Sequence, residues 1–313
     1  MSVLFGVATS APQVMAQSST GKPVRIVVPY PAGGGIDAMA RAFQDEVAKR
    51  LGQPVIVENR PGAGGVVGAK AVVASDPDGT MLLLGIASNI HSIFNKNFVD
   101  ASKELAAVSN VGYGPLIFFV TSGLPVRNLQ ELIAYAKAQP PNKLNFAVVA
   151  PIAELTMHMV RSKTGITFTP IQYKGAAPLV NAMLSGEADM AFNTWLGLGQ
   201  HVQAGKAKAL FYAAPKRNDL FPEVPLARDF GLQELEGSAT NIGLWAARAT
   251  PNDVIQRLSR AAAASVQLPE ITERIRKIGF EVIGSTPEDQ LRAFDIEIKF
   301  FSDAARLANY VPQ

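Results

Sequence analysis

The chain has 313 residues, of which 48% are hydrophobic and 18% are charged, and it contains no cysteine. Such a composition suits one or two globular domains and excludes a disordered or fibrous protein. The net charge is only +3, which argues against a nucleic-acid partner. Without cysteine the chain can form no disulfide, thiolate metal site or iron–sulfur cluster, and we expect no lipid anchor on an N-terminal cysteine.

The first residues have most features of a secretory signal. No charged residue precedes Lys22, residues 3–15 are largely apolar, and the segment 14–16 offers small residues where a signal peptidase would cut. The basic stretch that usually opens such a signal is missing, so a flexible apolar tail is the alternative. No segment is long and apolar enough to span a membrane. We expect residues 1–17 to be a signal peptide and the mature protein to be soluble in the periplasm.

Strands and helices alternate along the rest of the chain. Short apolar runs predict strands at 24–28, 55–57, 81–86, 116–121, 144–149, 168–173, 189–193, 209–213 and 242–247. Apolar residues at helical spacing predict helices at 36–51, in the residues before Ser75, and at 128–139, 152–163, 177–185, 252–267, 270–278 and 287–308. Asn128 and Glu131 form a pattern like a capping box at the start of one of these helices.

This alternation predicts an α/β protein. Strands that are apolar on both faces and joined by helices form parallel sheets. Right-handed crossovers bring the turns after these strands to the carboxyl edge of the sheet, where ligands of open α/β sheets bind. The chain is too long for one sheet, so we expect two lobes. No linker rich in Pro, Gly or Ser separates them, which predicts that strands cross between the lobes.

The sharpest local feature is a glycine-rich turn, Gly33 to Gly35, between the first strand and the first helix. Glycines let backbone N–H groups approach an anion closely, and the helix dipole favours negative charge there. The turn lacks the lysine and the spacing of nucleotide-binding loops, whereas a carboxylate would fit. The alternative is a tight turn that needs positive φ. Asp37 is either a cap of the helix or a partner for an amino or hydroxyl group of a ligand.

Other polar or helix-starting residues follow later strands. Arg60 precedes a second glycine-rich turn, 62–65, and we expect it to brace that loop rather than meet an anion. Ser88 and Asn89 supply neutral hydrogen-bonding groups after the third strand, although ordinary loop polarity would explain them as well. In the second half, helix starts or strand ends carry Ala150, Pro151, Tyr173, Asp189 and Asn193.

Catalytic patterns are missing. The sequence has no G-x-S-x-G or H-E-x-x-H motif, and its three histidines are widely separated. Glu154 and His158 are four residues apart on one helix, which favours a surface pair over a metal site because no third ligand is in view. We therefore expect no enzymatic activity, no metal and no cofactor.

Several segments in register resemble one family. The segments 24–41, 59–68 and 77–80, followed by 173–175, 186–190, 221–225 and 279–288, are similar to the receptors of tripartite tricarboxylate transporters, often called Bug receptors. This resemblance implies a type II periplasmic-binding-protein fold, with a mostly parallel sheet flanked by helices in each lobe and a ligand cleft between the lobes. The first lobe would comprise 22–121 and 242–313, and the second lobe 122–241.

The resemblance also implies a set of ligand-binding positions. They are Tyr30, Ala32, Gly33, Gly34 and Asp37 on the first loop, Ser88 and Asn89 on a neighbouring loop, and Ala150, Pro151, Tyr173, Asp189 and Asn193 in the second lobe. The chain departs from the family at Gly35-Ile36, at the loop 149–152, and at Asn241, where an aromatic residue is usual. Glu154 lies near the altered loop, and we add it to the site. It suggests either a ligand with an amino group beside its carboxylate or a receptor whose specificity has drifted.

The function that follows is capture of a small organic carboxylate by closure of the two lobes. The closed, monomeric receptor would then deliver the ligand to integral-membrane transporter subunits. One alternative is a binding module for signalling that has no transport partner. Another is an enzyme that uses the glycine-rich turn for a phosphorylated substrate.

Overall fold

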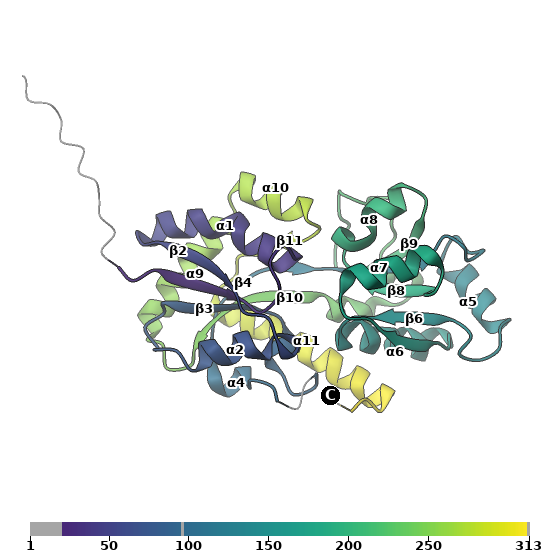
Figure 1. The fold of residues 1–313 in the computed structure, drawn as a ribbon, viewed down its shortest axis with the longest axis horizontal. Coiled ribbons are helices and arrows are strands. Elements are labelled where there is room, and N and C mark those ends of the chain that lie inside the picture. Colours follow the sequence, from purple (N-terminus) through teal and green to yellow (C-terminus); the bar gives the residue numbers. More distant parts are fainter. Residues whose placement is uncertain (1–20, 95–96, 312–313) are drawn as a thin grey trace, which may run out of the picture.

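The structure is a computed structural model that describes residues 21–94 and 97–311. It forms two α/β lobes side by side (Figure 1). The expected signal peptide, residues 1–17, lies outside the described residues. In the part of the chain that is described, we find no helix whose length and apolar character would let it cross a membrane.

The first lobe is built on a six-stranded sheet with the order β11-β4-β10-β3-β1-β2. The strands are β1 (Val24–Val28), β2 (Val55–Asn59), β3 (Met81–Gly85), β4 (Leu105–Gly114), β10 (Thr240–Ala247) and β11 (Glu281–Val282). The helical elements are α1 (Gly35–Leu51), η1 (Ala63–Gly65), α2 (Val66–Val73), α3 (Ala87–Ile90), α4 (Ala101–Glu104), α9 (Asn252–Val266) and α10 (Pro269–Lys277). β1 pairs in parallel with β2 and β3, whereas β10 runs antiparallel to β3 and β4.

The second lobe is built on a five-stranded sheet with the order β7-β6-β8-β5-β9. The strands are β5 (Leu116–Thr121), β6 (Asn145–Val148), β7 (Thr169–Gln172), β8 (Met190–Asn193) and β9 (Ala207–Ala213). The helical elements are α5 (Leu129–Lys137), α6 (Pro151–Thr164), α7 (Ala176–Ser185), α8 (Trp195–Gln203), η2 (Ala227–Phe230) and η3 (Gln233–Ser238). β6 is parallel to β7 and β8, and β5 is antiparallel to β8 and β9.

Most strands of each sheet run in one direction, as expected, but both sheets are mixed, because β10 and β11 in the first sheet and β5 in the second run against the others. The cause is the pair of chain crossings between the lobes. β4 ends in the first sheet and β5 begins in the second directly after it, and β10 returns to the first sheet from the second lobe. A strand that arrives from the other lobe enters its sheet at the edge where the lobes meet, so it runs against the strands that end there.

The lobe boundary also differs from the expected one. Residues 116–121 were expected in the first lobe, but β5 is a central strand of the second sheet. Its side chains Ile117 and Phe119 pack into the same core cluster as Leu179 and Tyr212, which belong to the second lobe. The crossing therefore precedes Leu116 instead of following Thr121.

The C-terminal helix α11 (Pro287–Ala308) joins the two lobes from one side. In Figure 1 this yellow helix runs beneath both of them. Its buried Phe294 and Phe301 belong to one core cluster with Leu83 of β3 and Phe118 of β5. The helix was expected within the first lobe, but its apolar face is long enough to be buried against both lobes. Phe300 and Phe301 of this helix are buried in the same cluster, and their rings pack edge to face.

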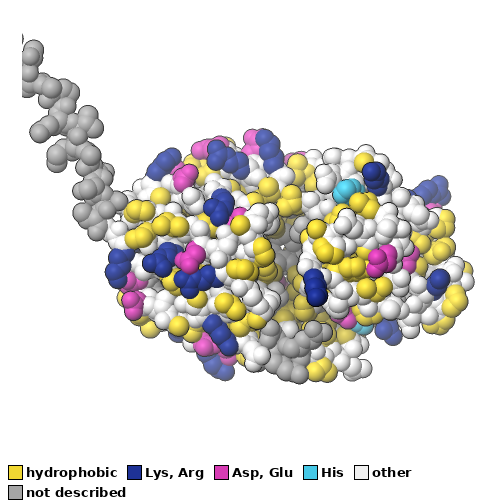
Figure 2. Space-filling model, viewed as in Figure 1, with side chains coloured by type: hydrophobic (Ala, Val, Ile, Leu, Met, Phe, Trp, Pro, Cys, Tyr) yellow, Lys and Arg dark blue, Asp and Glu magenta, His cyan; other side chains and the backbone are white. Residues whose placement is uncertain are grey.

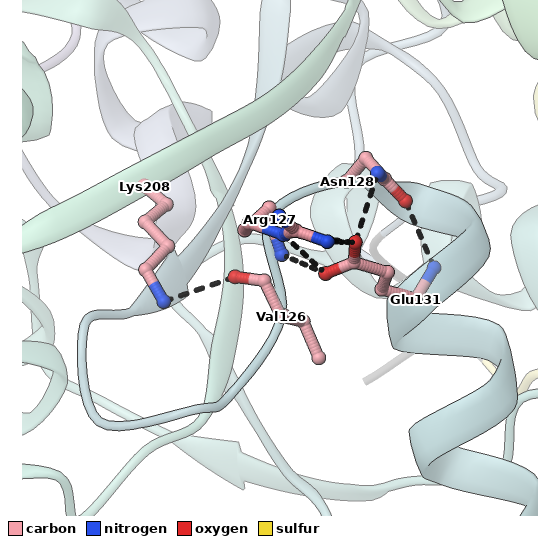
Figure 3. A network of polar contacts seen from close by, with 5 residues as sticks. All are labelled: Val126, Arg127, Asn128, Glu131 and Lys208. Carbon is pink, nitrogen blue, oxygen red and sulfur yellow. Dashed lines mark hydrogen bonds and ion pairs between the residues drawn. The ribbon is translucent and has the colours of Figure 1, made fainter.

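Helix α5 begins with the cap that its sequence predicted (Figure 3). The Asn128 side-chain Oδ1 accepts a hydrogen bond from the backbone N–H of Glu131 at 2.9 Å. The Glu131 carboxylate binds the Arg127 guanidinium at 2.6 Å. The Lys208 ammonium group fixes the preceding loop by donating to the backbone carbonyls of Leu124 and Val126. The start of α5 is thus specified by side chains near it in sequence and by one strand of the sheet.

We expect Asn128→Ala to lower the free energy of unfolding by about 1 kcal/mol, because a helix N–H loses its acceptor. Urea denaturation measures this change. Asn128→Ser is the matched control, since serine also caps helices and should recover most of the loss. Equal stability of the alanine and serine variants would show that the cap bond contributes nothing.

Candidate ligand-binding site

The carboxyl ends of the parallel strands in both lobes lie where the lobes meet. In the first sheet, Gly114 at the end of β4 pairs with Thr240 at the start of β10, and Gly85 at the end of β3 pairs with Gly243. In the second sheet, Asn193 at the end of β8 pairs with Ile117 near the start of β5. A narrow furrow bordered by hydrophobic side chains separates the two lobes at this level (Figure 2). The loops after these strands therefore converge on the furrow.

The first glycine-rich turn forms an exposed lip at the start of α1. Ala32, Gly33 and Gly34 are exposed, and Gly33 has a φ of 84°, which favours glycine. Gly34 is the N-cap residue of α1. The first N–H groups of a helix have no acceptor within the helix, so the α1 N-terminus offers donors and a positive partial charge at this place.

Asp37 lies beneath this turn and holds it. Its side chain is only 3% exposed, and its carboxylate accepts hydrogen bonds from the Gly33 N–H at 2.8 Å, the Arg41 Nε at 3.1 Å and the Asn59 Nδ2 at 3.0 Å. Burial alone would raise the pKa of Asp37, but the hydrogen bonds from Arg41, Gly33 and Asn59 outweigh it and hold this pKa below its ordinary value. The geometry fits neither interpretation fully: α1 has no side-chain cap bond, and the buried Asp37 carboxylate braces the turn through Gly33, Arg41 and Asn59, which favours a structural role over a ligand contact.

Asn89 ties three loops of the first lobe together. It is fully buried. Its Nδ2 donates to the Tyr30 hydroxyl at 2.9 Å and to the Gly64 carbonyl at 2.6 Å, and its Oδ1 accepts from the Ile86 N–H at 3.2 Å. Burial raises the pKa of the Tyr30 phenol, which is also hydrogen-bonded to Asn89 and Ser88. Tyr30 is therefore a neutral hydrogen-bonding group at the base of the site.

The second glycine-rich turn is braced as expected. The Arg60 guanidinium binds the Glu58 carboxylate at 2.7 Å instead of pointing to a free anion position. Gly65 has a φ of 97°, and a Cβ atom at this position would overlap the Asn89 side chain. Glycine is therefore required here for the close approach of the turn to Asn89.

The second lobe contributes the N-terminus of α8, which the sequence analysis missed. Asn193 Oδ1 accepts the Thr194 N–H at 2.8 Å just before this helix. Leu196, which is 47% exposed, has its Cδ2 3.6 Å from the position that a Cβ on Gly35 would occupy. A Cβ on Gly279 of the first lobe would lie 3.2 Å from the Trp195 Cβ. The N-termini of α1 and α8 thus meet across the two lobes.

Phe280 closes the first-lobe side of this contact and was also missed. Its ring is the nearest neighbour of both Gly35 and Gly114, and a Cβ on either glycine would come within 2.8 Å of it. A residue larger than glycine at position 35 would therefore not fit beside Phe280 without a shift of that ring.

The expected second-lobe residues are not all brought together. Ala150 is the N-cap residue of α6 and Pro151 its first residue, so both stand at a helix start, as expected. Tyr173 instead directs its hydroxyl to the Glu187 carboxylate at 3.0 Å, and burial first and then this carboxylate raise the pKa of Tyr173 to about 12. Asp189 accepts the Asn145 N–H at 2.8 Å at the amino end of β8. Parallel strands put their amino ends at the edge away from the furrow. Asp189 is therefore separated from Asn193, at the carboxyl end, by the length of the strand, about 13 Å.

Glu154 lies on the first turn of α6 and is half-buried. Its carboxylate accepts a hydrogen bond from Gln172 Nε2 at 3.2 Å, and burial raises the pKa of Glu154 despite this bond. His158, on the next turn, packs its ring against Phe168. Within residues 21–94 and 97–311, no three His, Cys, Asp or Glu side chains are grouped so that they could hold a metal ion.

The family model described as tripartite tricarboxylate transporter family receptor matches residues 39–299. The chain belongs to this family. This receptor is 31% identical over 298 residues to the protein BugT of Bordetella pertussis, an alignment that covers 93% of this chain and 90% of BugT. The resemblance inferred from the sequence motifs is confirmed.

Solved structures agree with this assignment. The receptor superposes on the periplasmic binding protein BugD with a TM-score of 0.79 and 28% identity, over 93% of this chain and 99% of BugD. It superposes on a protein of R. palustris solved with adipate with a TM-score of 0.82 and 26% identity, over 93% of this chain and 98% of that one. The expected periplasmic-binding-protein fold is therefore confirmed.

Proposed function

We propose that this receptor captures a small organic carboxylate in the furrow, closes its lobes on it, and delivers it in the periplasm to the membrane subunits of a tripartite tricarboxylate transporter. The observation that carries the proposal is the meeting of the α1 and α8 N-termini from separate lobes beside an exposed glycine-rich turn. A ligand that bridges both lobes favours the closed state through contacts that only this state provides.

A carboxylate suits this arrangement better than other anions do. It needs several donors to replace its water, and two helix N-termini supply N–H groups that lie on both sides of the ligand. The nearby guanidinium groups are already engaged, since Arg41 binds Asp37 and Arg60 binds Glu58. The anion would therefore be held by backbone dipoles and by neutral groups such as the Tyr30 hydroxyl. The adipate found on the R. palustris relative supports a carboxylate of this kind.

Glu154 refines the proposed ligand. Within the described part of the chain its side chain accepts one side-chain hydrogen bond, from Gln172, which leaves carboxylate lone pairs for a further donor. We expect an ammonium group beside the ligand's carboxylate to use them. Glu154 stands on the first turn of α6, the helix that follows β6.

A thermal-shift screen of the mature protein tests the proposal. Monocarboxylates, dicarboxylates, amino acids and nucleotides are compared at equal ionic strength, with sodium chloride as the blank. A ligand at 100 times its Kd should add about 2.7 kcal/mol to the stability. We expect carboxylates or amino acids to raise the melting temperature. Stabilisation by nucleotides alone would overturn the proposal in favour of an enzyme of phosphorylated substrates.

A further inference from the structure

A second cavity lies behind the strands that cross between the lobes. Its volume is about 210 Å³, and it is lined by Tyr113 of β4, Asn241 of β10, Glu236 of η3, and Ala293, Ile296 and Glu297 of α11, among others. None of the residues assigned to the furrow site lines this cavity. It is large enough for a small organic molecule, because an engineered protein cavity of about 150 Å³ binds benzene.

Glu297 gives this cavity an unusual polar group. The side chain is 1% exposed. One carboxyl oxygen, Oε2, accepts a hydrogen bond from Asn241 Nδ2 at 3.0 Å, and Asn241 in turn accepts one from Asn110 Nδ2 at 2.8 Å. The other oxygen, Oε1, is buried and has no partner among the described residues. Buried polar atoms of this kind are rare in folded proteins and call for an explanation.

The charges around the cavity favour one kind of occupant. Glu236 is already paired with the Arg228 guanidinium at 2.5 Å, and the other titratable group that lines the cavity is the Tyr113 phenol. The described lining residues include no lysine, arginine or histidine. Glu297 therefore lacks a counter-ion, and the walls beside it, such as Ile296 and Ala293, are apolar. A carboxylate ligand would be repelled, whereas a cation with a hydrocarbon body would match both features.

We propose that this cavity is a second ligand site, which takes a small primary amine whose ammonium group binds Glu297 Oε1 and whose hydrocarbon body packs on the apolar wall. The site lies between both lobes, because Tyr113 and Asn241 are on the crossing strands and Glu236 belongs to the second lobe. An amine bound in this cavity therefore contacts the strands that connect the two lobes and not the residues assigned to the furrow ligand.

Isothermal titration of the full chain with cyclohexylamine tests this site. We expect binding by the wild type, no binding of cyclohexanol, and an affinity that falls about 10-fold to 100-fold in Glu297→Gln, because a hydrogen bond to a charged group is lost. Burial raises the pKa of Glu297 to about 8, so the carboxylate must lose its proton before it can bind an ammonium group. The wild-type affinity should thus rise on the order of 20-fold from pH 6.5 to 8.5, whereas that of Glu297→Gln should stay flat.

Two further variants make the result decisive. Ala293→Leu fills part of the cavity while Glu297 itself is kept, and it should also abolish binding, which covers the case in which Glu297→Gln fails to fold. Gly34→Asp, at the furrow, should bind cyclohexylamine like the wild type, so failure of this site and failure of the proposed carboxylate site are distinguishable. Three results would overturn the proposal. They are no binding of cyclohexylamine at concentrations on the order of 10 mM, equal binding of cyclohexanol, and a pH dependence of the affinity that is the same in Glu297→Gln as in the wild type.

Discussion

Gly34→Asp should weaken carboxylate binding about 100-fold while leaving the protein folded. The N-cap position of α1 has a φ of −78°, which any residue adopts, and a Cβ there would meet only the Pro31 carbonyl oxygen at 3.6 Å. Aspartate is a preferred N-cap residue, so its carboxylate would accept the N–H groups that we assign to the ligand. It would also repel the ligand's own negative charge. Losing charge-assisted hydrogen bonds accounts for an effect of this size.

The sign of the change in the free energy of unfolding distinguishes a loss of ligand contacts from damage to the fold. Replacing glycine by aspartate at an N-cap should raise the free energy of unfolding of the unliganded protein by roughly a few tenths of a kcal/mol, as urea denaturation would show. Gly34→Ala is the matched control, because it adds the same Cβ without charge or capping oxygen. Titration calorimetry with the carboxylate that gives the largest thermal shift compares the variants. Equal affinities of Gly34→Asp and Gly34→Ala would remove the α1 N-terminus from the site.

Most elements of the fold could be predicted because their signals are local. The apolar runs of β1, β3 and β5 and the cap at Asn128 lie within short segments, and the structure has them where they were expected. β4 and α8 were missed because their sequences contain residues that weaken the local signal. Gly112 in β4 lets the β11 backbone approach closely, and Gly199 in α8 makes room for the Trp195 ring. In β4 tertiary packing selects glycine, and in α8 the bulky Trp195 ring one turn earlier selects it, so neither glycine follows local propensity.

The site could be predicted only in part, for a related reason. The motifs located the turn at Gly33 and Gly34 and the loop at Asn89, since both follow strands directly. They could not show that the Asp189 carboxylate is engaged with the Asn145 N–H at the sheet edge away from the furrow, because this contact joins two separate strands. Nor could they pair Gly35 with Phe280, which lies near the other end of the chain. Contacts between distant segments decide which polar groups remain free for a ligand, and a single sequence does not reveal them.

Asn89→Ala should cost about 3 kcal/mol in the free energy of unfolding and should also weaken ligand binding. The substitution leaves the Tyr30 hydroxyl, the Gly64 carbonyl and the Ile86 N–H without their partner. A buried polar group that loses its partner costs about 1–3 kcal/mol, and partial relaxation of the loops keeps the total below the sum of three such losses. The ligand effect follows because Asn89 sets the position of Tyr30 and of the second glycine-rich turn.

A double-mutant cycle with Tyr30→Phe tests whether these loops act as one unit. Tyr30→Phe removes only the hydroxyl, so it should cost about 1 kcal/mol. In the Asn89→Ala background the same change should cost much less, because the hydroxyl has already lost its main partner. Urea denaturation of the four proteins gives the coupling energy between Tyr30 and Asn89. Additive losses of stability would contradict the idea that these loops act as one unit. A positive coupling, together with a parallel loss of ligand affinity in both single variants, would mean that Asn89 makes the lip of the furrow rigid before the ligand arrives.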